Sequence, residues 1–401
     1  MTRRQIVLVE FSPSGGLFQF AVRLGTALAG RGERVILLTG PDPEIRATVP
    51  GVEIRSVLPT WHPAAGATGM ARSRVLHLVR RGTRAGRLIA AWIVVAVTLA
   101  RLRPDAVLWS NWRFTFEPLF AAAITRLLPR TTFGMVAHEP LPRSDARDTS
   151  TPRSGRVLRA AFGAAWRRMD VAFVLGESAR RVVLDNWEPR GEVVVIPHGP
   201  VEAFGDHDPG ASADRTGRVI LFFGTWTRYK GIEQLLAAFA RVRQTVPDAR
   251  LVLAGAISAD LDAEAVTSSA GRVGNVDLRP GYVDSADVPG LFRAARVVAT
   301  PYLRASQSGV VHLAFSHGRP VVTTDVGDLA EAVRDEVSGL VVPAGDVAGL
   351  AGALERLLLD ADLAGRLGSR GYEGLAGTGD EAARRVSEAL DRCARGTAGR
   401  P

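Results

Sequence analysis

A glycine-containing turn with two cations lies just past the middle of the chain. The turn, Gly224 to Gly231 (GTWTRYKG), follows an apolar segment and precedes one with helical spacing, and it contains Arg228 and Lys230. Glycine lets a phosphate approach backbone N–H groups, and cations can neutralise charge that grows on a leaving diphosphate. The alternative is a solvated helix start, but cations are mildly unfavourable near a helix N-terminus. The turn therefore favours an anion site.

Two further turns offer N–H groups at a predicted helix start. Gly15 and Gly16 separate a short apolar segment from one with helical spacing. The other turn is formed by Gln307, Ser308, Gly309 and Val310. Ser308 can cap the helix that follows, while the N–H groups beside it face an anion. Each turn alone fits a purely structural role equally well, so the prediction depends on the agreement of three helix starts.

Histidines offer the other candidates for chemistry. His138 (VAHEP) is predicted at the carboxyl end of a buried strand, where a polar side chain would meet a substrate; a hydrogen-bonded core histidine is the alternative. His198 (IPHG) also follows a strand, and we interpret it as shaping a hinge. His312 and His317 are predicted on different helix faces, so we do not expect them to bind a metal together. No metal site is predicted.

The composition is typical of a globular protein. The chain has 401 residues, of which 46% are hydrophobic and 23% charged, which excludes disordered and collagen-like chains. A single cysteine, Cys393, excludes an internal disulfide and a multi-thiolate zinc site, and it favours a reducing cytoplasm. No secretory signal is expected, because the first apolar stretch ends at Glu10. The glycine patterns of dinucleotide-binding domains and P-loop NTPases are absent, so neither class is expected.

The cations are unevenly distributed. Lys plus Arg is 50 and Asp plus Glu is 41, and no acidic residue occurs between Glu53 and Asp105. Eight arginines of that stretch lie between residues 72 and 103: Arg72, Arg74, Arg80, Arg81, Arg84, Arg87, Arg101 and Arg103. We predict that residues 72–103 could contact an anionic membrane peripherally. The apolar run Leu88 to Ala100 is shorter than the roughly 18 residues that span a bilayer, so it is not expected to cross one. The alternative is a core helix with solvated arginines.

Elements of two kinds must position these residues. Short apolar segments alternate with helical ones along the chain, which favours an α/β fold of two doubly wound, Rossmann-like domains facing each other across a cleft. We predict an N-terminal domain over 1–199, a linker over 200–217, a C-terminal domain over 218–380 and a final helix over 381–401 that could pack back on the N-terminal domain. Ligands of such folds bind outside the carboxyl ends of the strands.

Eight motifs together resemble the family 4 glycosyltransferases, which are retaining enzymes with the two-domain GT-B fold. They are Ser12 to Gly16 (SPSGG), Arg103 to Val107 (RPDAV), Val195 to Gly199 (VIPHG), Phe223 to Ile232 (FGTWTRYKGI), Leu251 to Gly255 (LVLAG), Gly281 to Val283 (GYV), Gly318 to Glu331 (GRPVVTTDVGDLAE) and Ser338 to Asp346 (SGLVVPAGD). The resemblance implies a nucleotide diphosphate sugar held mainly by the C-terminal domain and an acceptor held mainly by the N-terminal one. No metal is implied.

The resemblance also implies roles for single residues. Lys230 matches the diphosphate-binding lysine of the family and His138 the histidine that contacts the transferring sugar. Thr225 replaces the usual arginine, for which Arg228 is the candidate substitute. Donor contacts are implied for Tyr282, Val283 and the loop residues Gln307, Ser308, Gly309 and Val310, besides Gly15 and Gly16.

One family feature is missing. The paired glutamates, spaced E-x7-E, align with Ala305 and Leu313, and the loop instead reads A-S-Q-S-G-V. Glu331 is the best remaining candidate for a carboxylate that binds the donor. The predicted function is therefore retaining transfer of a hexosyl-type sugar from a nucleotide diphosphate donor to an acceptor hydroxyl, the acceptor being a saccharide, a lipid-linked or a small molecule.

Two alternatives stay open at this point. The same fold serves nucleotide-sugar epimerases and phosphorylases, so the fold alone does not select the reaction. A non-catalytic protein that binds polyanions or membranes through the arginine-rich stretch is the other alternative. Nucleic acid is not expected as a partner, because no nucleic-acid-binding motif accompanies the charge.

Overall fold

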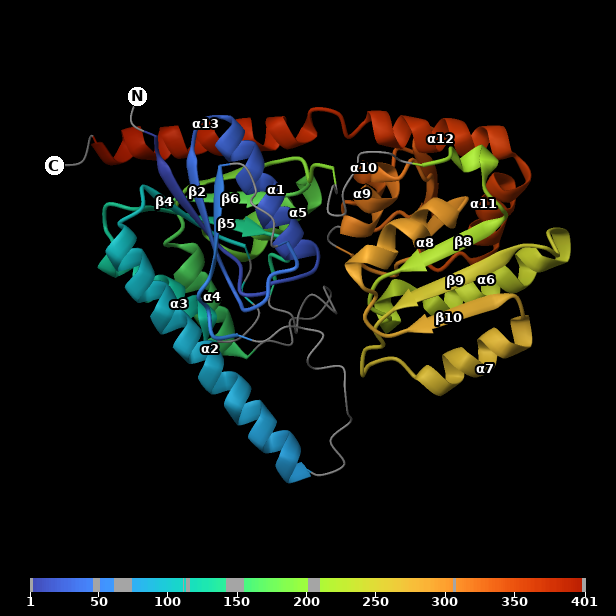
Figure 1. Ribbon diagram of the computed structural model, residues 1–401, viewed down its shortest axis with the longest axis horizontal. Coiled ribbons are helices and arrows are strands. Elements are labelled where there is room, and N and C mark those ends of the chain that lie inside the picture. Colours follow the sequence, from blue (N-terminus) through green and yellow to red (C-terminus); the bar gives the residue numbers. More distant parts are fainter. Residues whose placement is uncertain are drawn as a thin grey trace. The chain divides into compact units, whose positions relative to one another are not determined.

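A computed structural model describes most of the chain in two compact units. The described residues are 3–45, 51–60, 74–110, 112, 116–141, 155–200, 210–305 and 308–398, with the side chains of 74–81 and 396–398 left out. Unit 1 comprises residues 1–197 together with 379–401, and unit 2 comprises residues 198–378. Each is built from strands that alternate with helices along the chain (Figure 1).

Unit 1 is built on a parallel sheet with helices on its faces. In its described part the strand order is β3-β2-β1-β4-β5-β6-β7. The strands are β1 (Gln5–Val9), β2 (Arg34–Thr39), β3 (Val52–Ser56), β4 (Ala106–Trp109), β5 (Thr132–Ala137), β6 (Val171–Val174) and β7 (Glu192–Val195). The helices are α1 (Gly16–Gly30), α2 (Arg74–Leu102), α3 (Glu117–Leu127), α4 (Arg156–Trp166), α5 (Glu177–Asn186) and α13 (Thr378–Ala398). Continuous apolar strands fit this architecture, since helices cover both faces of a parallel sheet.

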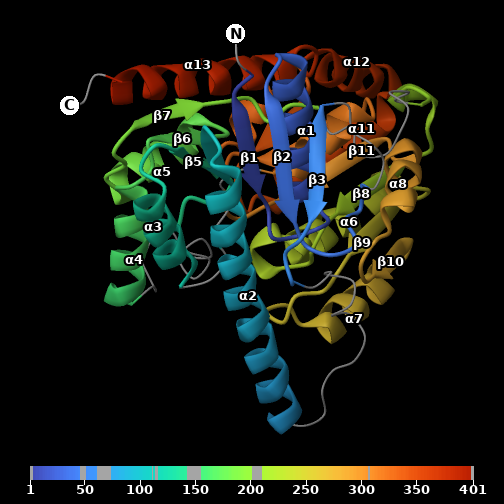
Figure 2. The ribbon, with the colours of Figure 1, turned by 60° about the vertical axis from the view of Figure 1, so that its left-hand side comes forward.

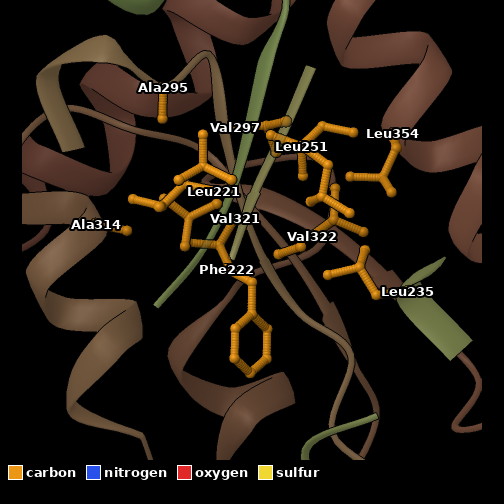
Figure 3. Packing of buried hydrophobic residues seen from close by; sticks show 14 of the residues in the cluster. Leu221, Phe222, Leu235, Leu251, Ala295, Val297, Ala314, Val321, Val322 and Leu354 are labelled. Atoms are coloured by element: carbon orange, nitrogen blue, oxygen red, sulfur yellow. The ribbon is translucent and has the colours of Figure 1, made fainter. Parts of the chain in front are cut away.

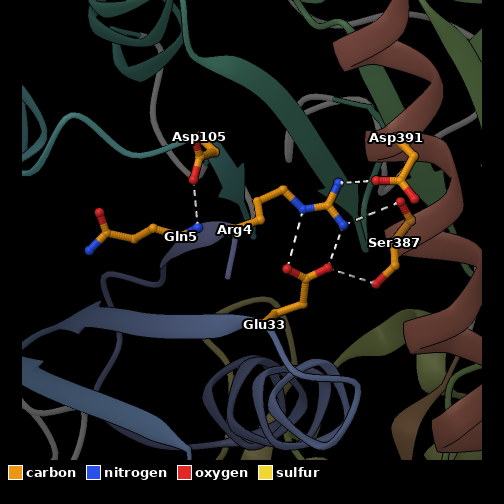
Figure 4. Close-up of polar contacts among 6 residues, drawn as sticks. All are labelled: Arg4, Gln5, Glu33, Asp105, Ser387 and Asp391. Atoms are coloured by element: carbon orange, nitrogen blue, oxygen red, sulfur yellow. Dashed lines mark hydrogen bonds and ion pairs between the residues drawn. The ribbon is translucent and has the colours of Figure 1, made fainter. Parts of the chain in front are cut away.

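The C-terminal helix α13 belongs to unit 1 although it comes last in the sequence. Its apolar face, including Ala383, Val386 and Leu390, is buried against residues of β1, β2 and α1. Arg4 adds polar contacts to this packing, because its guanidinium bonds both Glu33 and Asp391, the latter at 2.9 Å (Figure 4). The final helix predicted over 381–401 thus packs on the N-terminal unit, beginning at Thr378 in the structure.

Unit 2 repeats the parallel architecture. In its described part the strand order is β10-β9-β8-β11-β12-β13. The strands are β8 (Val219–Phe223), β9 (Arg250–Gly255), β10 (Val276–Pro280), β11 (Val297–Thr300), β12 (Val321–Thr324) and β13 (Gly339–Val342). The helices are η2 (Ala213–Arg215), η3 (Arg228–Lys230), α6 (Ile232–Thr245), α7 (Ala263–Val273), η4 (Ser285–Asp287), α8 (Val288–Ala294), α9 (Gly309–Ser316), α10 (Leu329–Ala332), α11 (Val347–Leu359) and α12 (Ala361–Glu373).

Neighbouring strands and helices supply the core of unit 2 (Figure 3). Leu221 of β8 and Val297 of β11 lie among helix residues such as Ala314 of α9 and Leu354 of α11, all buried. Burial of apolar area in this way supplies the main stabilisation of a domain. Both units are doubly wound parallel α/β layers, so the predicted fold class is confirmed.

Residues 210–217 differ from our interpretation of 200–217 as a linker. They include the short η2 helix (Ala213–Arg215), which packs on α12 and in which Ala213 is fully buried. Two buried arginines of unit 2 hold them, since Arg296 donates to the Thr216 carbonyl and Arg319 to the Ala211 carbonyl. Backbone carbonyls of this segment, rather than its polar side chains, therefore hold it to unit 2. The rest of the predicted linker, residues 201–209, lies outside the described residues.

Candidate functional site

Two glycines shape the carboxyl edge of the sheet in unit 2. Gly224 follows β8 with a φ of 111°, and Gly255 ends β9 with a φ of 147°, conformations that L side chains rarely adopt. A Cβ on Gly255 would lie 2.0 Å from the Gly224 carbonyl oxygen, so a side chain is excluded there. A Cβ on Gly224 would lie 3.0 Å from Lys230 Nζ and 3.8 Å from Val310 Cγ2. The predicted turn and the predicted α9 start therefore meet at Gly224.

Lys230 is held at this edge by an aromatic ring. It ends η3, and Gly231, at a φ of 70°, connects this turn to α6. The Lys230 ammonium lies 5.4 Å from the centroid of the Tyr302 ring, within the range of a cation–π interaction. Lys230 is the only lysine in a chain that carries 49 arginines. A compact ammonium on a flexible stem can approach a phosphate as a point charge, which a planar guanidinium cannot do in the same way.

Tyr302 connects the two predicted motifs. It follows β11 and is almost fully buried, and its hydroxyl lies 3.4 Å from Ser308 Oγ. Burial raises the pKa of the Tyr302 hydroxyl to about 12, so it stays protonated and can donate a hydrogen bond. The sequence analysis missed Tyr302. The signal that could have found it is its position directly after a buried strand, at the edge where ligands bind.

Ser308 is the N-cap of α9. Its hydroxyl accepts a hydrogen bond from the Val310 N–H at 3.3 Å, and its backbone is extended, as a cap requires. The first turn of a helix carries partial positive charge on its N–H groups. Because Val310 lies beside Gly224, the start of α9 and the Lys230 ammonium converge on one region. Gln307, which we predicted as part of this site, lies outside the described residues.

Two stacked histidines lie against the start of α9. The rings of His198 and His312 are 4.2 Å apart between centroids and nearly parallel. A Cβ on Gly309 would lie 3.7 Å from His198 Nε2, and His312 Nδ1 lies 3.4 Å from the Ser308 carbonyl oxygen. His198 thus belongs to unit 2 and lies at the candidate site. From its sequence position we had interpreted it only as shaping a hinge.

The other predicted donor residues follow strands of the same sheet. Thr225 and Arg228 are exposed in the turn that carries Lys230. Tyr282 is exposed and Val283 half-buried after β10, and Glu331 is exposed on α10 after β12. The carboxyl ends of parallel strands share one edge, so all five lie along the edge that holds Lys230. The positions aligned with the missing glutamates, Ala305 and Leu313, pack on the apolar core instead.

His317 lies apart from this site. Its ring stacks on Phe292 at 5.5 Å, and burial, followed by the charges of nearby arginines, lowers its pKa to about 4. His312 and His317 therefore occupy separate environments. Among the described residues no group of three or more His, Cys, Asp or Glu side chains is placed to hold a metal ion.

The glycine turn of unit 1 is bonded to a carboxylate of its own chain. Gly15, at a φ of 84°, is the N-cap of α1, and its N–H donates to Glu44 Oε2 at 2.9 Å. Gln19 of α1 bonds the same carboxylate. A Cβ on Gly15 or Gly16 would meet nothing within 4 Å, so the turn is open. The Gly15 N–H that we expected to face a phosphate is thus engaged by Glu44, a residue that the sequence analysis missed.

His138 is positioned in unit 1 by packing. It follows β5, is 3% exposed, and meets the ring of Phe20 edge-on at 4.7 Å between centroids. Burial above all, then the charge of Arg23, lowers the pKa of His138 to about 3. The imidazole is therefore neutral at physiological pH. A neutral imidazole can donate one hydrogen bond and accept another from hydroxyl groups, but it carries no charge.

Comparison with known proteins finds a family model that matches part of unit 2. Residues 217–360 match the family model described as glycosyl transferases group 1. The chain is 31% identical over 206 residues to a phosphatidyl-myo-inositol mannosyltransferase of Mycobacterium leprae, covering 50% of this chain and 54% of that protein. It is 36% identical over 155 residues to a D-inositol 3-phosphate glycosyltransferase of Segniliparus rotundus, covering 36% of this chain and 34% of that protein. The matches thus span about half or less of these curated relatives.

Solved structures match over nearly the whole chain. Sucrose-phosphate synthase from Thermosynechococcus elongatus aligns with a TM-score of 0.72 at 21% identity, covering 99% of this chain and 100% of that one. Anabaena HepE in complex with UDP and glucose aligns with a TM-score of 0.70 at 16% identity, covering 97% and 100%. The resemblance inferred from the motifs is confirmed: the chain has the fold of the GT-B glycosyltransferases, and its residues 217–360 match the model of the glycosyl transferases group 1 family.

Proposed function

We propose that the protein transfers a sugar from a nucleotide diphosphate donor to an acceptor hydroxyl. The observation that carries this proposal is the convergence of the Lys230 ammonium, the side-chain-free Gly224 and the start of α9 within unit 2. These are the features that bind a diphosphate: one cation, a backbone that a phosphate can approach, and N–H groups at a helix start. The same residues fall within the family match at 217–360.

The proposed reaction retains the configuration of the transferred sugar. The bond between the anomeric carbon and the diphosphate oxygen breaks, and the acceptor oxygen bonds to that carbon from the face that the diphosphate leaves. The departing diphosphate takes the proton of the acceptor hydroxyl. Lys230, Arg228 and the N–H group of Gly309 stabilise the charge that develops on the leaving group. In this proposal no metal is needed, because these groups supply the positive charge.

His138 is the proposed contact for the transferring sugar. As a neutral imidazole it would hydrogen-bond a sugar hydroxyl without attracting the diphosphate. Packing against Phe20 fixes the ring in one orientation, which suits a positioning contact. Variant His138→Asn should therefore lower turnover more than it lowers affinity for the free nucleoside diphosphate.

The names of the relatives suggest where to look for substrates. Two relatives are named for D-inositol 3-phosphate and phosphatidyl-myo-inositol, and a structural neighbour was solved with UDP-glucose. We therefore propose UDP-glucose among the first donors to test, with D-inositol 3-phosphate and phosphatidylinositol as the first acceptors. A cytoplasmic location agrees with the single cysteine.

The only side-chain amine of the chain gives a direct test of the donor site. Nucleoside diphosphates should protect Lys230 from an amine-reactive reagent and should raise the melting temperature, since a ligand at 100 times its Kd stabilises by about 2.7 kcal/mol. The best donor is then incubated with acceptors, and NMR of the product reads the anomeric configuration. Lack of protection by every nucleotide would refute the donor site, whereas a donor altered without any acceptor would indicate an epimerase. Turnover abolished by EDTA and restored by a divalent cation would contradict metal independence.

A further inference from the structure

Helix α2 of unit 1 has two apolar faces. One face packs into the core, where Leu88, Trp92, Val95 and Leu99 are buried. On the other face Ile89 is 42% exposed, Ile93 55% and Val97 42%. Residues four apart share one face of a helix, so these three side chains form a continuous stripe. A core helix of a globular protein ordinarily turns polar residues to solvent, but between residues 88 and 100 the exposed positions of α2 are apolar.

The exposed stripe continues without charge along most of the described helix. Its positions, at spacings of three or four, are Gly82, Gly86, Ile89, Ile93, Val97 and Ala100, here called the α2 face. Both views show the first turns of α2 running beyond the sheet of unit 1 (Figures 1 and 2). A contiguous exposed apolar surface of this kind marks an interaction site more often than a chance cluster.

The charges around the α2 face indicate which kind of partner it binds. Arg84, Arg87, Arg101 and Arg103 are exposed on and just after the helix, and the sequence from 54 to 104 holds no acidic residue. A second copy of this face would bring arginines toward arginines, with no carboxylate of this stretch to compensate. A surface of anionic lipid headgroups, by contrast, offers an apolar layer for the isoleucines and negative charge for the arginines.

The helix is anchored too well to cross a bilayer in this fold. Among the described residues, 82–102 are long and apolar enough for a span, and 28% of the most apolar window is buried. Yet Trp92 packs against Phe11, Trp109 and Phe120, with ring centroids 4.9 to 5.8 Å apart. Spanning would remove these rings from the core, whereas lying on a membrane leaves them in place. We propose that the α2 face docks the protein peripherally on an anionic lipid surface.

Vesicle sedimentation of the full chain tests this proposal. The protein should sediment with vesicles that contain phosphatidylglycerol, at least tenfold more than with pure phosphatidylcholine, and 1 M salt should reduce the difference because screening shortens to about 3 Å. The double variant Ile89→Ser, Ile93→Ser should lose at least tenfold in binding. Leu359→Ser, which alters a comparably exposed leucine of α11 in unit 2, is the matched control and should bind as the unaltered protein does.

Two outcomes would overturn the proposal. Equal sedimentation of the double variant and the unaltered protein would show that the α2 face does not contact lipid. A dimer in sedimentation velocity without lipid, lost in the double variant, would show that a second copy covers this face. The proposal does not depend on the transferase activity, and protection of Lys230 by nucleotide, measured on the same variant, should remain unchanged.

Discussion

The two units share one backbone plan and give it opposite charge. In each, the turn between the first strand and the first α-helix contains a glycine at positive φ, Gly15 in unit 1 and Gly224 in unit 2. In unit 1 the N–H at this turn bonds the Glu44 carboxylate, whereas in unit 2 the turn carries the Lys230 ammonium. The fold thus places backbone that an anion can approach in both units. A few side chains then determine whether a carboxylate of the protein occupies that position or whether it stays available to a ligand.

Removing the cation of unit 2 should have the largest effect on the candidate site. We expect Lys230→Ala to weaken binding of the best nucleoside diphosphate by tenfold or more, since charge-assisted bonds contribute roughly 1.5–3 kcal/mol. Isothermal titration calorimetry measures the change. Arg250→Ala, at the amino edge of the same sheet, is the control and should bind normally. If the Lys230 variant binds the nucleoside diphosphate with unchanged affinity, the ammonium that distinguishes unit 2 from unit 1 does not determine where the diphosphate binds.

Each unit also buries one histidine with a lowered pKa, which predicts acid sensitivity in both. His138 and His317 titrate at about 3 and about 4 when folded but near 6.5 when unfolded. Below pH 6.5 these histidines bind protons in the unfolded chain but not in the folded one. The contribution of the two histidines to the free energy of unfolding therefore falls as the pH falls toward their folded pKa values, and it is constant above pH 6.5.

Single substitutions should separate the two contributions. Between pH 7.5 and pH 5 each histidine should lower the free energy of unfolding by about 2 kcal/mol, which is 1.4 kcal/mol per pH unit over about 1.5 units. His317→Phe and His138→Phe should each reduce the loss by that amount in urea unfolding at the two pH values. A variant that shows the same acid loss as the unaltered protein would mean that its histidine is already protonated or solvated in the folded unit.

The start of α9 can be tested by deleting one N–H group. Gly309→Pro removes that N–H at the first helical position, where proline is tolerated, and the extended backbone of Ser308 suits a residue before proline. We expect about tenfold weaker diphosphate binding with an unchanged melting temperature. Gly309→Ala keeps the N–H, and its Cβ would make ordinary contact with His198, so it should bind nearly as well as the unaltered protein. Equal weakening in both variants would point to steric blocking.

The smallest effect is expected from unit 1. Glu44→Gln removes the negative charge beside α1 but keeps an oxygen that can accept the Gly15 N–H. If unit 2 alone holds the diphosphate, its Kd should change less than twofold in calorimetry. A tenfold gain in affinity would instead reveal that the start of α1 also contacts the donor and that Glu44 competes with it.

Sequence alone was sufficient where the determining residues are neighbours in the chain. The alternation of strand and helix periods predicted two parallel α/β units, because that periodicity is set by which residues face a core. Lys230 and Ser308 were chosen as candidates in the same way, since each belongs to a short turn between a strand and a helix, and their role in donor binding stays a prediction. The resemblance carried by eight short motifs also needed nothing beyond the residue order.

The tertiary structure alone decided what residues far apart in the chain do together. The Tyr302 ring beneath Lys230, the stack of His198 on His312, and the bond from Gly15 to Glu44 each join separate turns, and no local pattern encodes such pairs. Periodicity likewise could not tell that one apolar face of α2 is buried and the other exposed. Burial depends on which elements pack against a helix, and only the folded chain determines that.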